Sequence, residues 1–244
     1  MSEPALRRAL VTGGSGDIGA AICRRLARAG LHVMVHAHRN RERAKGLVAE
    51  IGNAGGSAEV IAFDVTQPEE TAERLRTLLQ AGPIQVLVSN AGGYRDAPMA
   101  GMNQAQWRYP IDVSLHGFFN VTQPLLLPMM ATRWGRIIAI SSVAGVIGNR
   151  GQSNYAAAKA GLSGAVKSLS LEVASRGITV NAVAPGVIAG HITTREFAAD
   201  AIKQLVPMKR AGTPDEVAAL VTFLASNDAA YISGQIISVN GGMA

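Results

Sequence analysis

The chain has 244 residues, 48% of them hydrophobic and 16% charged, which fits one large α/β domain over residues 1–244 and excludes an intrinsically disordered chain. Its only cysteine, Cys23, excludes intrachain disulfides and a thiolate metal cluster, so we expect it to pack as a small apolar residue. The net charge of +6 favours an acidic partner, while scattered basic residues and an aromatic content of 5% argue against nucleic acid.

Secretion and membrane insertion are not expected either. The apolar run near the start is too short for a signal peptide, and nowhere do about 18 apolar residues follow one another. We therefore expect a cytoplasmic protein with no membrane partner.

Seven apolar runs rich in valine and isoleucine alternate with helical patterns. In chain order they are residues 8–12, 32–37, 58–64, 84–90, 135–141, 177–183 and 235–241. Such runs are typical of strands buried on both faces, which predicts a Rossmann-type doubly wound sheet of seven mostly parallel strands with helices on both faces. Ligands of such sheets bind beyond the carboxyl ends of the strands, where the polar segments of this chain fall.

The first strand is followed by TGGSGDIG, residues 12–19, which opens a helix that ends near Gly30. Glycines let the backbone approach a pyrophosphate closely, and the start of the helix offers unpaired N–H groups to its charge. This setting predicts dinucleotide binding by Gly13, Ser15, Gly16, Asp17, Ile18 and Gly19. The Asp17 carboxylate would repel a nearby phosphate, so we expect it to cap the helix or to interact with the helix dipole.

The second strand ends in His38 and Arg39, where an NAD-binding fold usually has an acidic residue. A 2′-phosphate could pair with Arg39, assisted by His38 or Arg41, which predicts NADP(H) as cofactor; the alternative is a solvated basic turn. His36 and His38 would share a strand face, but no third ligand is evident nearby, so we expect no metal site.

The third strand ends in Asp64 and Val65. The Asp64 carboxylate could reach the amino group of an adenine, or it could cap the helix that begins near Pro68. The sequence leaves both roles open.

The stretch SNYAAAKAG, residues 153–161, sets Tyr155 and Lys159 four positions apart in an alanine-rich segment, so both side chains should project from one face of a helix. An ammonium about 4 Å from a phenol would lower the phenol's pKa by roughly three units, from 10 towards 7. The fifth strand delivers Ser142 to the same crevice, where its hydroxyl could hold a substrate carbonyl or make a strand-end hydrogen bond.

With these motifs, and with SNAG at 89–92, ISSVAG at 140–145 and NAVAPGVI at 181–188, the sequence closely resembles the short-chain dehydrogenase/reductase family, and within it the 3-oxoacyl-(acyl-carrier-protein) reductases. The resemblance spans nearly the whole chain. It implies that Ser142 and Tyr155 bind the substrate carbonyl and that Lys159 and Tyr155 also contact the cofactor. Further implied cofactor contacts are Asn90, Ala91, Gly92, Pro185, Gly186 and Ile188.

The reaction implied by the resemblance is NADPH-dependent reduction of a 3-oxoacyl thioester on acyl carrier protein to the 3-hydroxyacyl form, with Tyr155 protonating the oxygen as hydride arrives. Two other functions stay open. One is a dehydrogenase of a free sugar, polyol or small alcohol, and the other is a weakly active NADP-binding regulatory protein. Retention of Ser142, Tyr155 and Lys159 favours activity.

Four positions depart from the family pattern. Asp17 replaces the middle glycine of the loop, Ser89 replaces an asparagine, Ser114 replaces the asparagine at the fourth catalytic position, and Gly190 replaces a common threonine. Ser114 can still bind water, though with fewer hydrogen-bonding groups than an amide. The departures resemble the specialised reductases of secondary fatty-acid or aryl-polyene assembly lines.

The resemblance also suggests partners. Arg133 and Arg176 match positions that bind the acidic carrier in related reductases, and are otherwise ordinary solvated arginines. Residues near 190–206 would form a substrate lid or a static cover. Small residues at 156–164 and the apolar segment 124–130 suggest a subunit interface, in a family that is commonly homotetrameric, or simple internal packing.

Overall fold

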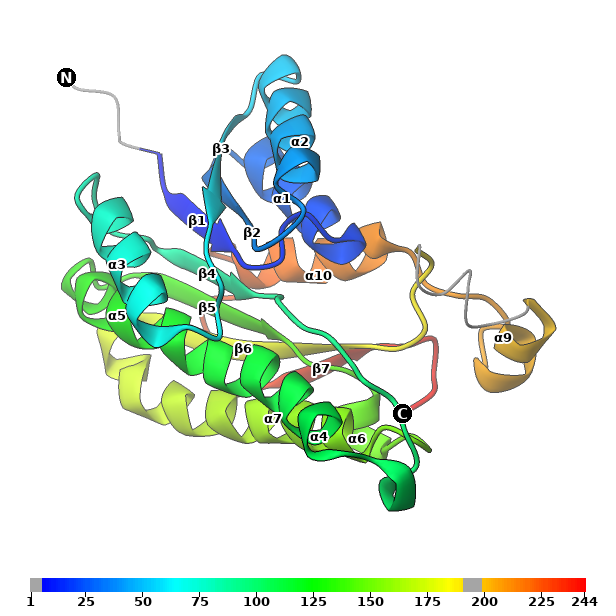
Figure 1. Ribbon diagram of the computed structural model, residues 1–244. Coiled ribbons are helices and arrows are strands. Elements are labelled where there is room, and N and C mark those ends of the chain that lie inside the picture. The colour runs from blue at the N-terminus through cyan, green and yellow to red at the C-terminus, as the bar shows by residue number, and fades with distance from the viewer. Residues whose placement is uncertain (1–5, 191–198) are drawn as a thin grey trace.

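A parallel sheet forms the centre of the structure (Figure 1), a computed structural model that describes residues 6–190 and 199–244. Its strands are β1 Arg8–Val11, β2 His32–Ala37, β3 Ser57–Ala62, β4 Val86–Ser89, β5 Gly135–Ile140, β6 Ile178–Pro185 and β7 Ile236–Val239. They lie in the order β3-β2-β1-β4-β5-β6-β7, and all neighbours pair in parallel. This confirms the predicted doubly wound sheet and places its switch point between β1 and β4.

Helices cover both faces of the sheet (Figure 1). One face carries α1 Asp17–Arg28, α2 Arg41–Asn53 and α10 Pro214–Leu224, and the other carries α3 Pro68–Leu79, α5 Gly117–Ala131 and α7 Ser153–Val173. Shorter elements are η1 Met99–Gly101, α4 Gln104–Ile111, the π-helical turn η2 Asp112–His116, α6 Ala144–Ile147, η3 Ala174–Arg176 and α9 Ala199–Leu205. No helix among the described residues is long and apolar enough to cross a bilayer.

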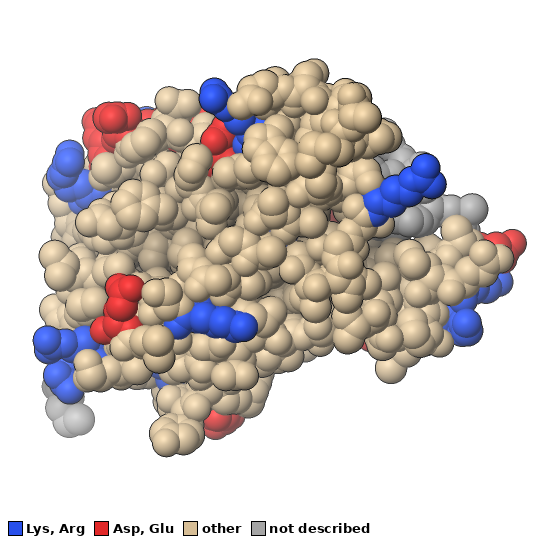
Figure 2. All heavy atoms as spheres, turned by 90° about the horizontal axis from the view of Figure 1, so that it is seen from below, with Lys and Arg blue, Asp and Glu red and all other residues tan. Residues whose placement is uncertain are grey.

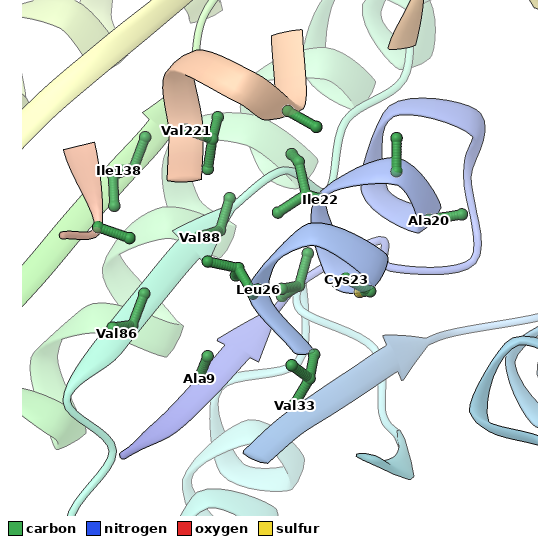
Figure 3. Close-up of a cluster of buried hydrophobic side chains, with 14 of the residues drawn as sticks. Ala9, Ala20, Ile22, Cys23, Leu26, Val33, Val86, Val88, Ile138 and Val221 are labelled. Carbon is green, nitrogen blue, oxygen red and sulfur yellow. The ribbon is translucent and has the colours of Figure 1, made fainter. Parts of the chain in front are cut away.

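The core on the α1 face joins that helix to the strands and to α10 (Figure 3). Ile22, Cys23 and Leu26 of α1 have no exposed surface and pack with strand residues such as Val33 and with Val221 of α10. Full burial of one such aliphatic side chain contributes about 2 kcal/mol. Burial also raises the pKa of Cys23 to about 12, so the thiol stays protonated and packs as an apolar group, as its sequence context predicts.

Several strands are shorter than the apolar runs that predict them, among them β3 at its carboxyl end and β4 at both ends. β3 ends at Ala62, and Phe63 and Asp64 leave the ladder because Asp64 Oδ1 accepts hydrogen bonds from the backbone and the hydroxyl of Thr66. The run at 84–90 contributes only Val86–Ser89 to the sheet. The turn at Asp64 carries the chain over the carboxyl end of the sheet.

Candidate active site

A cleft of about 900 Å³ lies at the carboxyl ends of the strands, beside the loops that follow β1, β2, β4, β5 and β6. It gathers most of the predicted site residues: Gly13, Ser15, Gly16, Asp17, Ile18, Gly19, His38, Arg39, Asp64, Val65, Asn90, Ala91, Gly92, Ser142, Tyr155, Lys159, Pro185, Gly186 and Ile188. The predicted residues Ser114, Arg133 and Arg176 lie outside its lining.

The glycine loop needs its glycines. Gly13 has a φ of +63°, a left-handed conformation that costs a glycine little. A Cβ on Gly19 would collide with the Gly13 carbonyl oxygen, because the first turn of α1 packs directly on the loop. The start of α1 therefore faces the cleft with its backbone N–H groups, the arrangement that binds a pyrophosphate.

His36, which the sequence analysis considered only as a metal ligand, anchors this loop. It is buried in β2, its Nδ1 accepts a hydrogen bond of 3.0 Å from the Gly13 N–H, and its Nε2 donates to the Phe63 carbonyl at 2.9 Å. These partners fix the neutral tautomer. Burial lowers the pKa of His36 to about 4. A polar residue inside an otherwise apolar strand was the available signal for this role.

Asn90 fastens the loop from the other side. Its amide Nδ2 donates to the carbonyls of Thr12 and Gly13, each at 3.0 Å, and its backbone N–H donates to the Thr12 hydroxyl at 2.9 Å. Thr12 Oγ1 also accepts from the backbone of Ala91. Asn90 thus lines the cleft as predicted and also holds the loop to the end of β4.

The basic turn after β2 borders the same cleft. His38 and Arg39 are exposed there, and His38 Nε2 lies 3.8 Å from Asp64 Oδ2. The suggestion that Asp64 caps the following helix is wrong, since Gln67 occupies that position and Asp64 closes its own turn with Thr66. Within the described residues, no group of His, Cys, Asp or Glu is arranged to hold a metal ion.

Ser142, Tyr155 and Lys159 meet at the other end of the cleft. The hydroxyls of Ser142 and Tyr155 share a hydrogen bond, and Ser142 Oγ also accepts from the Ala144 N–H at 3.2 Å. Lys159 is buried, and its ammonium donates to the Ile140 carbonyl at 2.9 Å, 5.6 Å from the centre of the Tyr155 ring. The strand end and one face of α7 therefore deliver these three groups to one place, as the spacing predicts.

The predicted lowering of the Tyr155 pKa is wrong for this geometry. Burial raises the pKa of Tyr155 above its ordinary value, the hydrogen bond to Ser142 lowers it, and the Asp96 carboxylate raises it. Lys159 contributes little because its ammonium is turned to the Ile140 carbonyl rather than to the phenol oxygen. Burial also lowers the pKa of Lys159 to about 8. Tyr155 consequently keeps its proton at neutral pH.

Comparison with known proteins agrees with this geometry. Residues 14–244 match the family model described as enoyl-(acyl carrier protein) reductase. The chain belongs to the short-chain dehydrogenase/reductase family. It is 43% identical over 236 residues to the 3-oxoacyl-(acyl-carrier-protein) reductase FabG of Aggregatibacter actinomycetemcomitans, covering 96% of this chain and 98% of that protein. It is 44% identical to the 3-oxoacyl-(acyl-carrier-protein) reductase of Synechocystis, with 96% of each covered, and 43% identical to nodulation protein G of Azospirillum brasilense, with 96% and 97% covered.

Among the departures from the family pattern, Ser114 lies behind the cleft in the π-helical turn η2. Its buried hydroxyl has no hydrogen-bond partner in the described part of the chain. A Cβ built on Gly92 would lie 3.3 Å from Lys159 Nζ and 3.7 Å from Ser114 Oγ, so both atoms flank this glycine. The hydroxyl is thus placed near the ammonium but not at the wall of the cleft.

Asp17 does not cap α1. The N-cap residue is Gly16, Asp17 is the first residue of the helix, and its Oδ1 accepts a hydrogen bond of 2.5 Å from Arg43 Nη2. Its position in the first turn still interacts favourably with the helix dipole, the other role the sequence suggests.

The substrate side of the cleft contains residues that sequence analysis missed. The Tyr94 ring stands edge-on to Tyr155 with 6.2 Å between centroids, and Tyr109, Asp96 and Gln152 line the same wall. Gln152 Nε2 donates to Asp96 at 2.7 Å. Tyr94, Asp96 and Tyr109 come from one segment and Gln152 from another, 56 residues beyond Asp96, and no spacing rule brings the two segments together.

The buried Asn154 holds this wall to α7. Its Nδ2 donates to the carbonyls of Arg95 and Gln106 at 2.9 and 2.7 Å. It directly precedes Tyr155, so the segments that would surround a substrate are fixed next to the phenol.

The predicted lid at 190–206 is only partly described. Residues 191–198 lie outside the described residues, while α9 follows them and its last residue, Leu205, lines the cleft. The lid therefore stays a prediction.

Arg133 and Arg176 lie at the amino ends of β5 and β6, where Arg133 Nη2 donates to the Ser175 carbonyl at 3.4 Å. The six residues of β5 separate this edge from Ser142 by about 20 Å at roughly 3.3 Å per residue. The structure thus places the predicted carrier-binding arginines together, but at the amino ends of the strands, whereas Tyr155 lies at the carboxyl ends.

Proposed function

We propose that this chain is an NADPH-dependent reductase of 3-oxoacyl thioesters carried by acyl carrier protein. The observation that carries this proposal is the placement of Ser142, Tyr155 and Lys159 in one cleft with an anchored glycine loop. Relatives named 3-oxoacyl-(acyl-carrier-protein) reductase, at 43–44% identity over nearly the whole chain, support the same substrate class.

The residues present fit a dinucleotide. Because Gly19 has no Cβ, the first turn of α1 packs directly on the Gly13 carbonyl, and the start of α1 supplies N–H donors for a pyrophosphate. Arg39 and His38 line the cleft and would pair with a 2′-phosphate, which favours NADPH over NADH. When bound, NADPH supplies the hydride.

The chain's own groups then handle the carbonyl oxygen. The Ser142 and Tyr155 hydroxyls donate hydrogen bonds to it, and Tyr155 transfers its proton as the carbonyl carbon accepts hydride. The resulting phenolate is stabilised by the hydrogen bond from the Ser142 hydroxyl before solvent returns the proton.

A second candidate is reduction of a carbon–carbon double bond, since the matching family model bears the description of an enoyl reductase. The two reactions are separated by NADPH oxidation assays with 3-oxobutyryl and 2-butenoyl groups on the same carrier. We expect turnover of the 3-oxo substrate with formation of the 3-hydroxyacyl product. Turnover of the butenoyl substrate alone would assign the enoyl reaction instead.

Free ketones, sugars and small alcohols complete that assay. Activity confined to these compounds would assign a dehydrogenase of free substrates. Tight NADPH binding without turnover of any substrate would assign a regulatory protein.

The preference for NADPH is tested at Arg39. Arg39→Asp should reduce the ratio of the affinity for NADPH to the affinity for NADH about a hundredfold. The 2′-phosphate of NADPH would then face a carboxylate that repels it instead of a guanidinium that pairs with it. Lys45→Asp, at an exposed residue of α2 that does not line the cleft, is the control. An unchanged ratio in the Arg39 variant would show that the phosphate lies elsewhere.

We also propose a homotetramer built on the face of α5 and α7. Phe119 and Leu127 of α5 are 64% and 76% exposed, and Leu171 of α7 is 84% exposed. The view in Figure 2, from below the lower helices of Figure 1, shows a broad central area without charged side chains. We expect Leu127→Glu to lower the mass measured by sedimentation velocity; an unchanged mass would remove this face from the interface.

Arg133 and Arg176 remain the proposed carrier-docking residues. Because they lie at the amino ends of the strands, far from the cleft of their own copy, a carrier bound there would deliver its acyl chain to the cleft of a neighbouring copy. Arg133→Glu with Arg176→Glu should raise KM for the carrier-bound substrate but not for a pantetheine thioester, while Arg74→Glu on α3 should change neither much. Equal effects on both substrates would exclude docking at this edge.

A further inference from the structure

The Asp17 carboxylate stands between two hollows of the surface. Asp17 lines the proposed dinucleotide cleft and also an adjacent hollow of about 540 Å³ between α1, α2 and the start of α10. Its partner Arg43, in the first turns of α2, lines only the second hollow. The hydrogen bond from Arg43 Nη2 to Asp17 Oδ1, 2.5 Å long, therefore draws the negative charge to the side away from the cleft.

Gly190 makes room for this orientation. A Cβ on Gly190 would lie 2.5 Å from Asp17 Oδ2 and 3.3 Å from its Cγ, both shorter than ordinary contact. Because the obstructing atom is the end of a side chain, an alanine at this position would displace the carboxylate rather than break the backbone. Two residues that depart from the family pattern therefore lie against each other. The carboxylate of Asp17, in the glycine loop, occupies space that a side chain at Gly190, after the Pro-Gly motif, would need.

We propose that Arg43 and Gly190 are positioning residues for NADPH binding, which together hold the Asp17 carboxylate outside the pyrophosphate site. The physical need is plain, because a carboxylate at the first residue of α1 that turned into the cleft would meet a dianionic pyrophosphate within a few ångströms. Neutralised by Arg43 and accommodated by Gly190, Asp17 leaves the N–H groups of α1 to the cofactor. This inference rests on the proposed function, since it assumes that the cleft binds NADPH.

The test is direct NADPH binding, measured by the fluorescence of the reduced nicotinamide with the whole chain and no substrate. Gly190→Ala and Arg43→Gln should each raise the Kd for NADPH about tenfold, because the freed carboxylate repels the pyrophosphate. Asp17→Asn should lower the Kd, because it removes the negative charge beside the pyrophosphate and keeps the backbone N–H groups of the loop. In the Asp17→Asn background, Gly190→Ala should have little further effect, since the displaced group carries no charge.

Arg24→Gln is the matched control. Arg24 also joins α1 to α2, through hydrogen bonds of 2.7 and 2.8 Å to Glu50, but it does not line the cleft. We expect the Kd of this variant to equal that of the wild type. Raising the salt concentration should narrow the difference in Kd for NADPH between Gly190→Ala and wild type, because salt screens charge repulsion. A purely steric defect would leave that difference unchanged.

The inference is overturned if Gly190→Ala weakens binding equally in the wild-type and in the Asp17→Asn backgrounds, if Arg24→Gln matches Arg43→Gln, or if Asp17→Asn itself weakens binding. Thermal unfolding of each variant without cofactor identifies variants that fail to fold, and Arg43→Gln tests the same claim if Gly190→Ala is one of them. Absence of NADPH binding in the wild type would refute the proposed function, and the inference with it.

Discussion

The two halves of the cleft are built in different ways. The cofactor half lies on strand ends and is tied by hydrogen bonds to the loop backbone, from His36 to the Gly13 N–H and from Asn90 to two carbonyls. The substrate half is made of segments that leave the sheet, joined by side-chain contacts such as Gln152 to Asp96.

This difference in construction matches a difference in role between cofactor binding, which members of a family share, and substrate choice, which differs between members. A dinucleotide imposes the same demands on every relative, so its half of the cleft is fixed by the sheet itself. A substrate varies, and the segments around it are held by contacts that single substitutions can change. Variants in the two halves should therefore respond independently.

The largest effect is expected at Tyr155. Tyr155→Phe should lower kcat about a thousandfold or more, because the variant retains the ring but has no proton to give. The Kd for NADPH should change little, since the loop anchors are intact. Stopped-flow reduction and fluorescence titration measure the two quantities, and an equal loss of both would contradict the separation of the halves.

The next effect concerns the buried ammonium. The pKa of Lys159 is about 8 in the folded protein without cofactor, against an ordinary value of 10.5. Below pH 8, where Lys159 is charged in both states, its burial therefore lowers the free energy of unfolding by roughly 3 kcal/mol. Between pH 8 and 10.5 the unfolded chain binds more protons, so the stability of the wild type should rise with pH in this window. Lys159→Met should therefore be more stable than wild type at pH 7, with the gap narrowing above pH 8.

The control for that comparison is Lys167→Met, an exposed lysine on the same helix. Because Lys167→Met retains Lys159, its free energy of unfolding in urea should differ from that of the wild type by the same amount at pH 7 and above pH 8. If Lys159→Met were less stable than wild type at pH 7, burial of the charged Lys159 would not destabilise the folded protein, contrary to this account.

A third effect tests the anchoring of the cofactor half. The pKa of His36 is about 4 when folded and 6.5 ordinarily, so the unfolded chain binds more protons between these values and stability falls as pH drops from 6.5 to 4, by up to about 3 kcal/mol. His36→Gln should lose this acid sensitivity and bind NADPH about tenfold more weakly, because the Gly13 N–H loses its ring acceptor.

His32→Gln is its control, a histidine on the same strand whose ring contacts Ser57 and Glu59 instead of the loop. Equal weakening of NADPH binding in both variants would show that strand packing, not the anchor, sets affinity.

The smallest effect is expected at Tyr94. Tyr94→Ala removes the ring that stands edge-on to Tyr155 and should change the ranking of 3-oxoacyl chains by several-fold in kcat/KM while leaving the Kd for NADPH unchanged. Tyr231→Ala, at a fully exposed tyrosine, should leave the ranking as it is. An unaltered ranking in the Tyr94 variant would remove this ring from the substrate wall.

The half of the cleft that follows local rules could be predicted from the sequence. Strand runs, a glycine loop before a helix and the four-residue spacing of Tyr155 and Lys159 each depend on neighbours in the chain, and the structure brings them together. His36 was missed as an anchor because its partners, Gly13 and Phe63, lie 23 and 27 residues away.

Besides the suggested Asp64 cap, two predictions failed for reasons of burial and direction. The pKa of Tyr155 was expected to fall on the basis of distance alone, but burial dominates and the ammonium faces the Ile140 carbonyl. Asp17 was expected to cap its helix or to interact with the helix dipole, and only the cap is wrong, because Gly16 is the N-cap residue and Arg43 holds the carboxylate to one side. Side-chain direction of this kind depends on the packed structure.

The measurement that tests the central claim most directly is NADPH oxidation with 3-oxobutyryl-acyl carrier protein, with the acyl product analysed by mass. We expect one 3-hydroxybutyryl product for each NADPH consumed, and loss of this turnover in Tyr155→Phe with cofactor binding preserved. Turnover that survives the loss of the phenol hydroxyl, or none in the wild type while NADPH is bound, would contradict the claim.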